Sequence, residues 1–237
     1  MSSSKIALVT GASRGIGKQI TALLLQDDYT VIACCMKEKN AEQLHQDFST
    51  TSNKFIVKNL DLRDAEAISD LRKELETKIS HIDVIINNAG VMDNNPAKLH
   101  KQTVEGWDNT LDTNLRAPFL ICKEMLSLMN KSSNGKILNI SGGLGSFSSG
   151  MTGGTHGAYR ISKIGINALS LILSEELRDE GIHVVAVDPG WVRTDLGGPD
   201  APKSPKQAAQ EIIDTLNNLG KTIKSGTLVK ESKTLSW

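Results

Sequence analysis

The sequence has no excess of either charge. Lys and Arg together number 27, as do Asp and Glu, which gives a formal net charge of zero at pH 7. Proteins that bind nucleic acids normally carry a basic excess or a basic stripe. The balance therefore argues against a nucleic-acid-binding protein.

Long apolar runs are also missing. No segment approaches the roughly 20 consecutive apolar residues that an α-helix needs to cross a bilayer, so we expect no membrane association. The first residues, MSSSKIALVT, lead directly into a strand-like run. That start leaves no room for a signal peptide.

Cysteine is scarce and has no metal-binding spacing. Cys34 and Cys35 are neighbours in an apolar run, and Cys122 lies in a helical one. These residues are expected to be small buried side chains, which is typical of a reduced, cytoplasmic protein. The sequence contains no HExxH motif and no carboxylate cluster, so no metal site is expected.

The chain alternates short β-rich runs with helical stretches along its whole length. Strands are predicted over residues 5–10, 30–35, 54–60, 82–87, 135–140, 181–188 and 226–230. Helices are predicted over 15–26, 40–48, 64–79 and 104–131, from 157 onward, and to about 219 after an N-cap at Ser204. The strands are apolar throughout, which indicates a parallel sheet covered by helices on both faces. Without a linker or repeat, residues 1–237 are predicted to form one doubly wound α/β domain of the Rossmann type, with a mostly parallel, seven-stranded sheet.

A glycine-rich turn follows the first predicted strand. Residues 10–17 read TGASRGIG, and the spacing of Gly11, Gly15 and Gly17 differs from the common GxGxxG pattern. Ligands of doubly wound sheets bind at the carboxyl ends of the strands. Glycines there let the backbone approach a pyrophosphate, and the next helix supplies unpaired N–H groups. Taken alone, the segment is weak evidence, because a simple tight turn is a less favoured but open alternative.

Several segments together resemble the short-chain dehydrogenase/reductase family. TGASRGIG is similar to that family's TGxxxGxG segment. In the family's order there follow Asp61 after the third strand, NNAG at 87–90, Asn114 in the long helix, YRISK at 159–163 and PGWVRT at 189–194. The resemblance extends over essentially the whole chain. It implies an oxidoreductase that uses a nicotinamide dinucleotide.

The resemblance also implies a set of cofactor-binding residues. Asp61, together with Leu62, would hold the adenine, Asn87 would line the cleft, and Thr194 would touch the carboxamide or the phosphates. The other expected contacts are Gly11, Ser13, Arg14, Gly15, Ile16, Gly17, Lys37, Asn88, Ala89, Gly90, Tyr159, Lys163, Pro189, Gly190 and Val192.

The end of the second predicted strand bears on the choice between NAD and NADP. An acid there would accept hydrogen bonds from the ribose hydroxyls of NAD and repel a 2′-phosphate. This sequence has Cys35, Met36 and Lys37 instead. Arg14 can form paired hydrogen bonds with a phosphate, whereas Lys37 could equally be a solvated surface lysine. NADP(H) is therefore predicted over NAD(H).

Tyr159 and Lys163 carry the predicted chemistry. They are four residues apart in a helical stretch, so both lie on one helix face. A nearby ammonium favours the phenolate and lowers the pKa of tyrosine from its usual value of about 10. We expect Tyr159 to exchange a proton with a small-molecule carbonyl or alcohol substrate during hydride transfer. Asn114 would hold a proton-relaying water or mend a local helix kink.

The loop after the fifth predicted strand departs from the family pattern. The residue that hydrogen-bonds the substrate oxygen is usually the second small residue after this strand, and here that residue is Gly142. Ser141 lies one position earlier, and a one-residue shift turns a strand side chain to the opposite face. Ser141 is nevertheless the predicted donor, with Ser146 or a backbone N–H as alternatives.

The remaining expectations concern the substrate, the activity and the assembly. Asp93, Phe147, Met151, His156 and Trp191 are candidates for the substrate end, although His156 could simply be solvated. The predicted activity is that of an NADP(H)-dependent carbonyl reductase. The alternatives are a specific ketoreductase, or a cofactor-binding sensor or scaffold weakened by Gly142. Family resemblance also suggests a homodimer or homotetramer through the helix that carries Tyr159.

Overall fold

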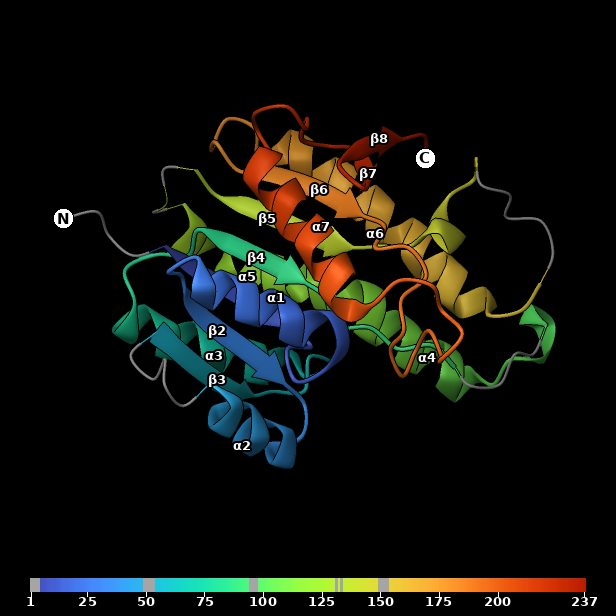
Figure 1. Ribbon diagram of the computed structural model, residues 1–237, viewed down its shortest axis with the longest axis horizontal. Coiled ribbons are helices and arrows are strands. Elements are labelled where there is room, and N and C mark those ends of the chain that lie inside the picture. Colours follow the sequence, from blue (N-terminus) through green and yellow to red (C-terminus); the bar gives the residue numbers. More distant parts are fainter. Residues whose placement is uncertain (1–4, 49–53, 94–97, 131, 133, 149–153) are drawn as a thin grey trace.

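The computed structural model describes residues 5–48, 54–93, 98–130, 132, 134–148 and 154–237 (Figure 1). Their strands form one eight-stranded sheet in the order β3-β2-β1-β4-β5-β6-β7-β8. The strands are β1 (Ile6–Thr10), β2 (Thr30–Cys35), β3 (Phe55–Asn59), β4 (Val84–Asn87), β5 (Lys136–Ile140), β6 (His183–Val187), β7 (Leu228–Lys230) and β8 (Lys233–Leu235). All neighbouring strands pair in parallel except β7 and β8. The predicted Rossmann-type, mostly parallel sheet is confirmed.

The strand count is one higher than predicted. β8 returns antiparallel to β7 through a tight turn in which Glu231 and Ser232 both have positive φ angles, 49° and 59°. Such turns match the twist of a hairpin but normally carry Asn-Gly or a similar pair. Without that pair, and with exposed polar residues in β8, the sequence has no strong strand signal here.

Helices cover both faces of the sheet (Figure 1). They are α1 (Gly15–Gln26), α2 (Glu38–Asp47), α3 (Ala65–Lys78), α4 (Val104–Leu111), α5 (Ala117–Met129), α6 (Gly157–Glu176) and α7 (Pro205–Asn218). One buried cluster includes side chains of α1 and α7, and the other includes side chains of α3 and α5. Within β1, Ala7 and Val9 belong to the first cluster, whereas Ile6 and Leu8 belong to the second. Burial on both faces explains why the strands are mostly apolar and do not alternate with polar residues.

The helix predicted over 104–131 is interrupted. A π-helical turn over Asp112–Arg116 (η3) separates α4 from α5. Such turns are rare and occur frequently at functional sites. Two short 3₁₀ turns, η2 (Leu99–Lys101) and η4 (Gly143–Gly145), lie near the N-terminal end of α6 and after β5. The predicted N-cap of α7 is confirmed, since Ser204 Oγ accepts a hydrogen bond from Gln207 N at 3.2 Å.

The strand order changes direction between β1 and β4. The chain moves outward from β1 to β2 and β3, then returns to place β4 on the other side of β1. At such a switch point the segments after neighbouring parallel strands diverge and leave a crevice at their carboxyl ends. The candidate site lies at these ends.

Candidate active site

The glycine-rich turn after β1 is packed against the loop after β4. Gly11 has a φ of +63°, and a Cβ there would lie 2.8 Å from Ala89 Cα. A Cβ at Gly17 would lie 2.3 Å from Gly11 O, so a side chain is excluded at both positions. Asn88 Nδ2 donates to Thr10 O at 2.9 Å. Thr10 Oγ1 in turn accepts from the backbone N–H groups of Asn88 and Ala89, each at 3.0 Å.

Helix α1 begins directly after this turn without a capping side chain. Arg14 is the extended N-cap residue, its side chain makes no cap hydrogen bond, and the first turn holds no acidic residue. A helix N-terminus of this kind suits an anion such as a phosphate. A Cβ at Gly15 would lie 3.1 Å from Thr194 Cγ2, so the segment after β6 borders the same turn. The residues predicted to hold a dinucleotide thus converge from β1, β4 and β6.

Arg14 and Lys37 lie on the surface beside this turn. The Arg14 guanidinium pairs with Asp195 at 2.5 Å, and both side chains are more than 70% exposed. Lys37 is exposed at the start of α2, directly after β2. Ala12 N donates to Cys34 O at 3.1 Å, which holds the glycine turn against the end of β2.

Asp61 is already bound to a neighbouring guanidinium. Its carboxylate accepts from Arg63 Nη2 at 2.7 Å and from Arg63 N at 3.0 Å. These hydrogen bonds lower the pKa of Asp61 and keep it ionised. Leu62 is partly buried beside it.

Asn87 does not line the crevice, contrary to the sequence-based expectation. It is buried, and its Nδ2 donates to Asn139 Oδ1 at 2.8 Å. Asn87 and Asn139 pair in register across β4 and β5. Successive strand residues point to opposite faces, so Asn87 turns to the interior and Asn88 to the glycine turn.

Tyr159 and Lys163 lie one turn apart in α6, at the carboxyl end of β5. Lys163 is 4% exposed, and its Nζ donates to Ile140 O at 2.8 Å. The same Nζ lies 5.4 Å from the centroid of the Tyr159 ring. Burial lowers the pKa of Lys163 to about 8, although the Asp188 carboxylate opposes that shift.

The pKa of Tyr159 shifts in the direction opposite to the one expected from the ammonium. Burial, with a smaller effect of Asp188, raises it to about 12. The phenol is therefore protonated at neutral pH. That is the form a proton donor needs.

Asn114 lies in the π-helical turn and clamps the loop after β4. Its Oδ1 accepts from Val91 N and its Nδ2 donates to Val91 O, both at 2.8 Å. The Nδ2 also donates to Ser162 Oγ at 3.1 Å. A Cβ at Gly90 would lie 3.5 Å from Asn114 Oδ1 and 3.8 Å from Lys163 Nζ. Asn114 therefore holds the Gly90–Val91 backbone close to Lys163, and its amide is committed to that role.

Ser141 is turned away from the tyrosine, and Gly142 faces it. Ser141 is 2% exposed and donates to Asn167 Oδ1 at 2.6 Å. A Cβ at Gly142 would lie 3.6 Å from Tyr159 Oη and within 4 Å of no other heavy atom. The geometry therefore contradicts Ser141 as a donor to a substrate beside Tyr159, because the one-residue offset directs its hydroxyl into the core. Ser146 is buried as well, with its Oγ 2.9 Å from Ser148 Oγ.

Asp188, at the end of β6, is a buried acid that the sequence reading missed. Its Oδ1 accepts from Gly190 N at 2.9 Å, and Lys230 Nζ lies 3.6 Å from its Oδ2. A Cβ at Gly143 would lie 3.3 Å from Asp188 Oδ2, so this charge lies close to the Gly142–Gly143 backbone. The sequence does hold a signal for this residue: an acid stands directly before the Pro–Gly pair, at the carboxyl end of a predicted strand.

The residues expected at the substrate end lie in several different environments. Phe147 and Trp191 are exposed, and the indole Nε1 of Trp191 donates to Gly197 O at 2.7 Å. Asp93 lies against α4, since a Cβ at Gly106 would be 2.6 Å from its Oδ2. His156 is the N-cap residue of α6. Met151 lies outside the described residues.

The described part of the chain has neither a metal-binding cluster nor a membrane-spanning helix. It holds no group of three or more His, Cys, Asp or Glu side chains arranged for a metal ion. No helix within it is long and apolar enough to cross a membrane.

Comparison with known proteins assigns the chain to a family. The family model described as short chain dehydrogenase matches residues 5–204. The chain belongs to the short-chain dehydrogenase family. As a short-chain dehydrogenase it is an oxidoreductase of the kind that acts on carbonyl or alcohol groups.

Individual short-chain dehydrogenases agree with this assignment. The 3-oxoacyl-[acyl-carrier-protein] reductase FabG of Thermotoga maritima is 31% identical over 212 residues, which cover 90% of this chain and 82% of that protein. The NADPH-bound carbonyl reductase from chicken fatty liver superposes with a TM-score of 0.89 at 28% identity, covering 99% of each chain. The carbonyl reductase Sniffer of D. melanogaster gives 0.90 at 29% identity, also over 99% of each chain.

Proposed function

We propose that this short-chain dehydrogenase reduces carbonyl compounds to alcohols with NADPH, and that Tyr159 is the proton donor. The observation that carries the proposal is the position of the Tyr159 hydroxyl. It faces the free space at Gly142, one helical turn from Lys163 and at the crevice where the predicted dinucleotide contacts converge. The glycine cradle at Gly11 and Gly17, which a Cβ would fill, fits the pyrophosphate of such a cofactor.

The chain's own residues would handle the proton. Bound NADPH would supply the hydride. Tyr159, protonated because burial raises its pKa to about 12, gives its proton to the oxygen that becomes the alcohol. The Lys163 ammonium stabilises the tyrosinate left behind and would bind the nicotinamide ribose hydroxyls. Asn114 fixes Gly90 and Val91 so that the floor of the crevice keeps its shape.

The preference for NADP(H) is supported from two sides. Cys35 ends β2 and Met36 follows it, where an NAD-specific site would place an acid, and Arg14 and Lys37 are exposed nearby. The chicken liver carbonyl reductase, similar over 99% of this chain, is described with NADPH bound. Asp61 and Leu62 would contact the adenine, and Pro189, Gly190, Val192 and Thr194 would border the nicotinamide end.

Replacing Tyr159 by Phe tests the proposal. The substitution removes the transferable proton and keeps the ring, so NADPH should bind with nearly unchanged affinity. Turnover of a panel of aldehydes and ketones should fall by about 10²–10⁴-fold, the usual contribution of a general acid. NADPH absorbance at steady state measures turnover, and fluorescence titration measures binding. Undiminished turnover in this variant would remove Tyr159 from the mechanism.

A second candidate function follows from Gly142. A site without the usual hydroxyl opposite Tyr159 could belong to a cofactor-binding sensor with weakened chemistry. Tight NADPH binding with no turnover on any carbonyl of the panel would favour that function. Turnover restricted to 3-oxoacyl substrates would instead favour a ketoreductase like the similar FabG protein.

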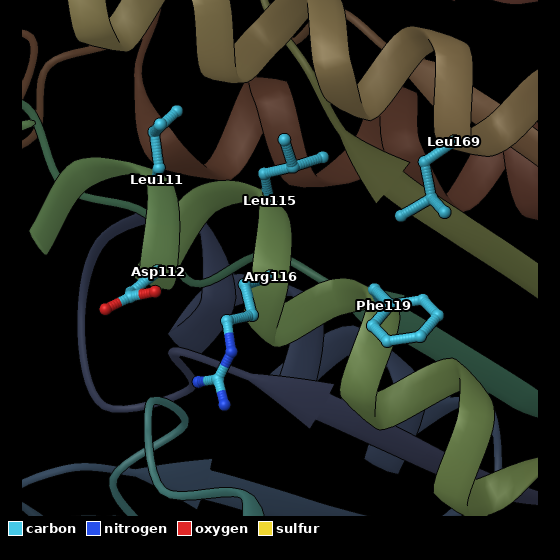
Figure 2. A pocket seen from close by; sticks show the side chains of 6 residues that line it. All are labelled: Leu111, Asp112, Leu115, Arg116, Phe119 and Leu169. Atoms are coloured by element: carbon cyan, nitrogen blue, oxygen red, sulfur yellow. The ribbon is translucent and has the colours of Figure 1, made fainter. Parts of the chain in front are cut away.

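A second copy of the chain is the partner we propose. Figure 2 shows a hollow between the π-helical turn, α5 and α6, with Phe119 and Leu169 on its two sides; its lining residues are Leu111, Asp112, Leu115, Arg116, Phe119 and Leu169. Phe119 is 46% exposed and adds apolar surface to this hollow. Asp112 and Arg116 border the hollow with opposite charges. A two-fold axis would place Asp112 of one copy opposite Arg116 of the other, as a self-complementary interface requires.

The cysteines favour a reducing, cytoplasmic setting. Cys34, Cys35 and Cys122 are all buried and none forms a disulfide. Burial raises the pKa of Cys34 and of Cys122 to about 12, so both are unreactive thiols.

A further inference from the structure

His156 has two unfavourable features. It is a non-glycine residue in the left-handed region, with φ 63° and ψ 42°. Its ring Nδ1 is buried and has no hydrogen-bond partner among the described residues. Unusual backbone conformations and unpaired buried polar atoms persist where the surroundings impose them, and they concentrate at functional sites.

The surroundings of His156 hold it from both sides. Arg160 Nε donates to Thr155 O at 3.1 Å, and Arg160 N donates to His156 O at 3.0 Å. On the other side, Ala158 N donates to Gln102 Oε1 at 3.2 Å. These hydrogen bonds hold the backbone on both sides of His156, which has the left-handed conformation.

His156 precedes Tyr159 by three residues at the start of α6. His156 is the N-cap of α6 and Tyr159 is the third helical residue, and the side chains at these two positions are neighbours at a helix start. N-cap side chains normally accept a hydrogen bond from the first turn, but His156 makes none. The ring therefore has no helix-capping role.

Among the described residues, no second side-chain hydroxyl is seen opposite the Tyr159 hydroxyl, at the position where the family pattern usually has one. Gly142 brings no side chain to the position opposite Tyr159 Oη. Ser141 is committed to Asn167, and Ser146 is committed to Ser148. A carbonyl oxygen that receives a proton from Tyr159 is stabilised by a second donor, and losing such a donor typically costs about 10²–10³ in rate.

We propose that His156 is a substrate-binding residue that donates a hydrogen bond from Nδ1 to the carbonyl oxygen, compensating for the hydroxyl that Gly142 lacks. The inference rests on the proposed carbonyl reductase function. Tyr159 remains the proton donor, and the imidazole only binds and orients the oxygen. The buried Nδ1 gains its missing partner when substrate arrives.

The test combines substitutions at both positions, with 4-nitrobenzaldehyde as the carbonyl probe. His156→Gly removes the ring and suits the left-handed backbone, so the fold is retained. We expect kcat/KM to fall by about 10–10²-fold with unchanged NADPH affinity. His156→Gln, which keeps a donor, should recover part of the loss. His45→Ala, a change at an exposed histidine on α2, is the matched control and should have no effect.

Gly142→Ser supplies the decisive comparison. Gly142 has an extended backbone with φ 172°, and a Cβ there makes only an ordinary contact with Tyr159 Oη. A serine is therefore tolerated and adds a hydroxyl beside the tyrosine. If His156 and that hydroxyl serve the same oxygen, Gly142→Ser should raise kcat/KM much more in the His156→Gly background than in the wild type. Equal gains in both backgrounds would overturn the proposal.

Binding of the product alcohol separates this inference from the proposed function. In the Tyr159→Phe background, 4-nitrobenzyl alcohol bound to the NADP⁺ complex is measured by quenching of tryptophan fluorescence. We expect His156→Gly to weaken this binding at least fivefold. If the wild type shows no carbonyl turnover but this loss is seen, the proposed function fails and His156 still binds the oxygen. Normal turnover with unchanged alcohol affinity, or no alcohol binding at all, would overturn the role of His156.

Discussion

Lys163, which we propose as the partner of Tyr159, is buried at a cost to stability. Its folded pKa of about 8 lies below the 10.5 of a free lysine. Between these two pH values the unfolded chain binds more protons than the folded one, so stability rises with pH in that window. Below pH 8 the cost of burying the ammonium is fully present.

Lys163→Met should stabilise the protein at pH 7 while abolishing its turnover. The pKa difference corresponds to about 3 kcal/mol, part of which is lost because Ile140 O loses its donor. The expected net gain is about 1–2 kcal/mol in the free energy of unfolding, measured by urea titration. The gain should shrink as pH rises from 8 toward 10.5. A destabilised variant would show that the hydrogen bond to Ile140 outweighs the buried charge.

Side-chain direction at strand ends is where the sequence reading succeeded least. Spacing alone predicted that Tyr159 and Lys163 share a helix face, because an α-helix fixes that geometry. Ser141 and Asn87 were assigned to the crevice, yet both turn inward to Asn167 and Asn139. Their direction depends on the phase of the strand and on partners more than 25 residues away. No local pattern reports those partners.

At the scale of elements, the N-terminus of α1 should carry the preference for NADPH. Arg14 is paired with Asp195, but both side chains are mostly exposed. Such a pair contributes only about 0–1 kcal/mol, so a 2′-phosphate can displace the aspartate.

Arg14→Ala should therefore weaken NADPH binding about tenfold and change NADH binding less than twofold. Fluorescence titration with each cofactor measures both affinities. Asp195→Ala is the matched control, because it frees Arg14 and should leave NADPH affinity equal or higher. Equal losses for NADH and NADPH would show that Arg14 acts on a part common to both cofactors.

The break in the helix predicted over 104–131 could not be predicted from the sequence either. The segment 104–131 reads as one helix because its composition is helical throughout. The structure inserts a π-helical turn where Asn114 binds both backbone groups of Val91. That contact joins segments 23 residues apart, and it fixes the backbone of the loop after β4. The alternative that Asn114 mends a helix irregularity therefore agrees with its position.

On the scale of the whole molecule, the sequence predicted the core well and the outer surfaces poorly. Strands that are mostly apolar without alternation require cover on both faces, and the two buried clusters supply it. The apolar side chains that line the hollow beside Phe119 are not covered in this way by the described part of the chain. Phe119 is 46% exposed beside Leu115 and Leu169, and the proposed contact with a second copy of the chain would cover it.

Phe119→Asp should convert a dimer into a monomer. The new carboxylate would lie in the apolar centre of the proposed interface and opposite its own copy, so two like charges would be buried together. Size-exclusion chromatography with light scattering measures the mass against the 25.6 kDa of one chain. Val104→Asp is the matched control, because Val104 is 76% exposed and does not line the hollow. A wild-type protein that is monomeric at micromolar concentration, or a variant that stays dimeric, would place the contact elsewhere. Because Leu169 lies in the same helix as Tyr159, dissociation should also loosen α6 and lower the turnover of the monomer.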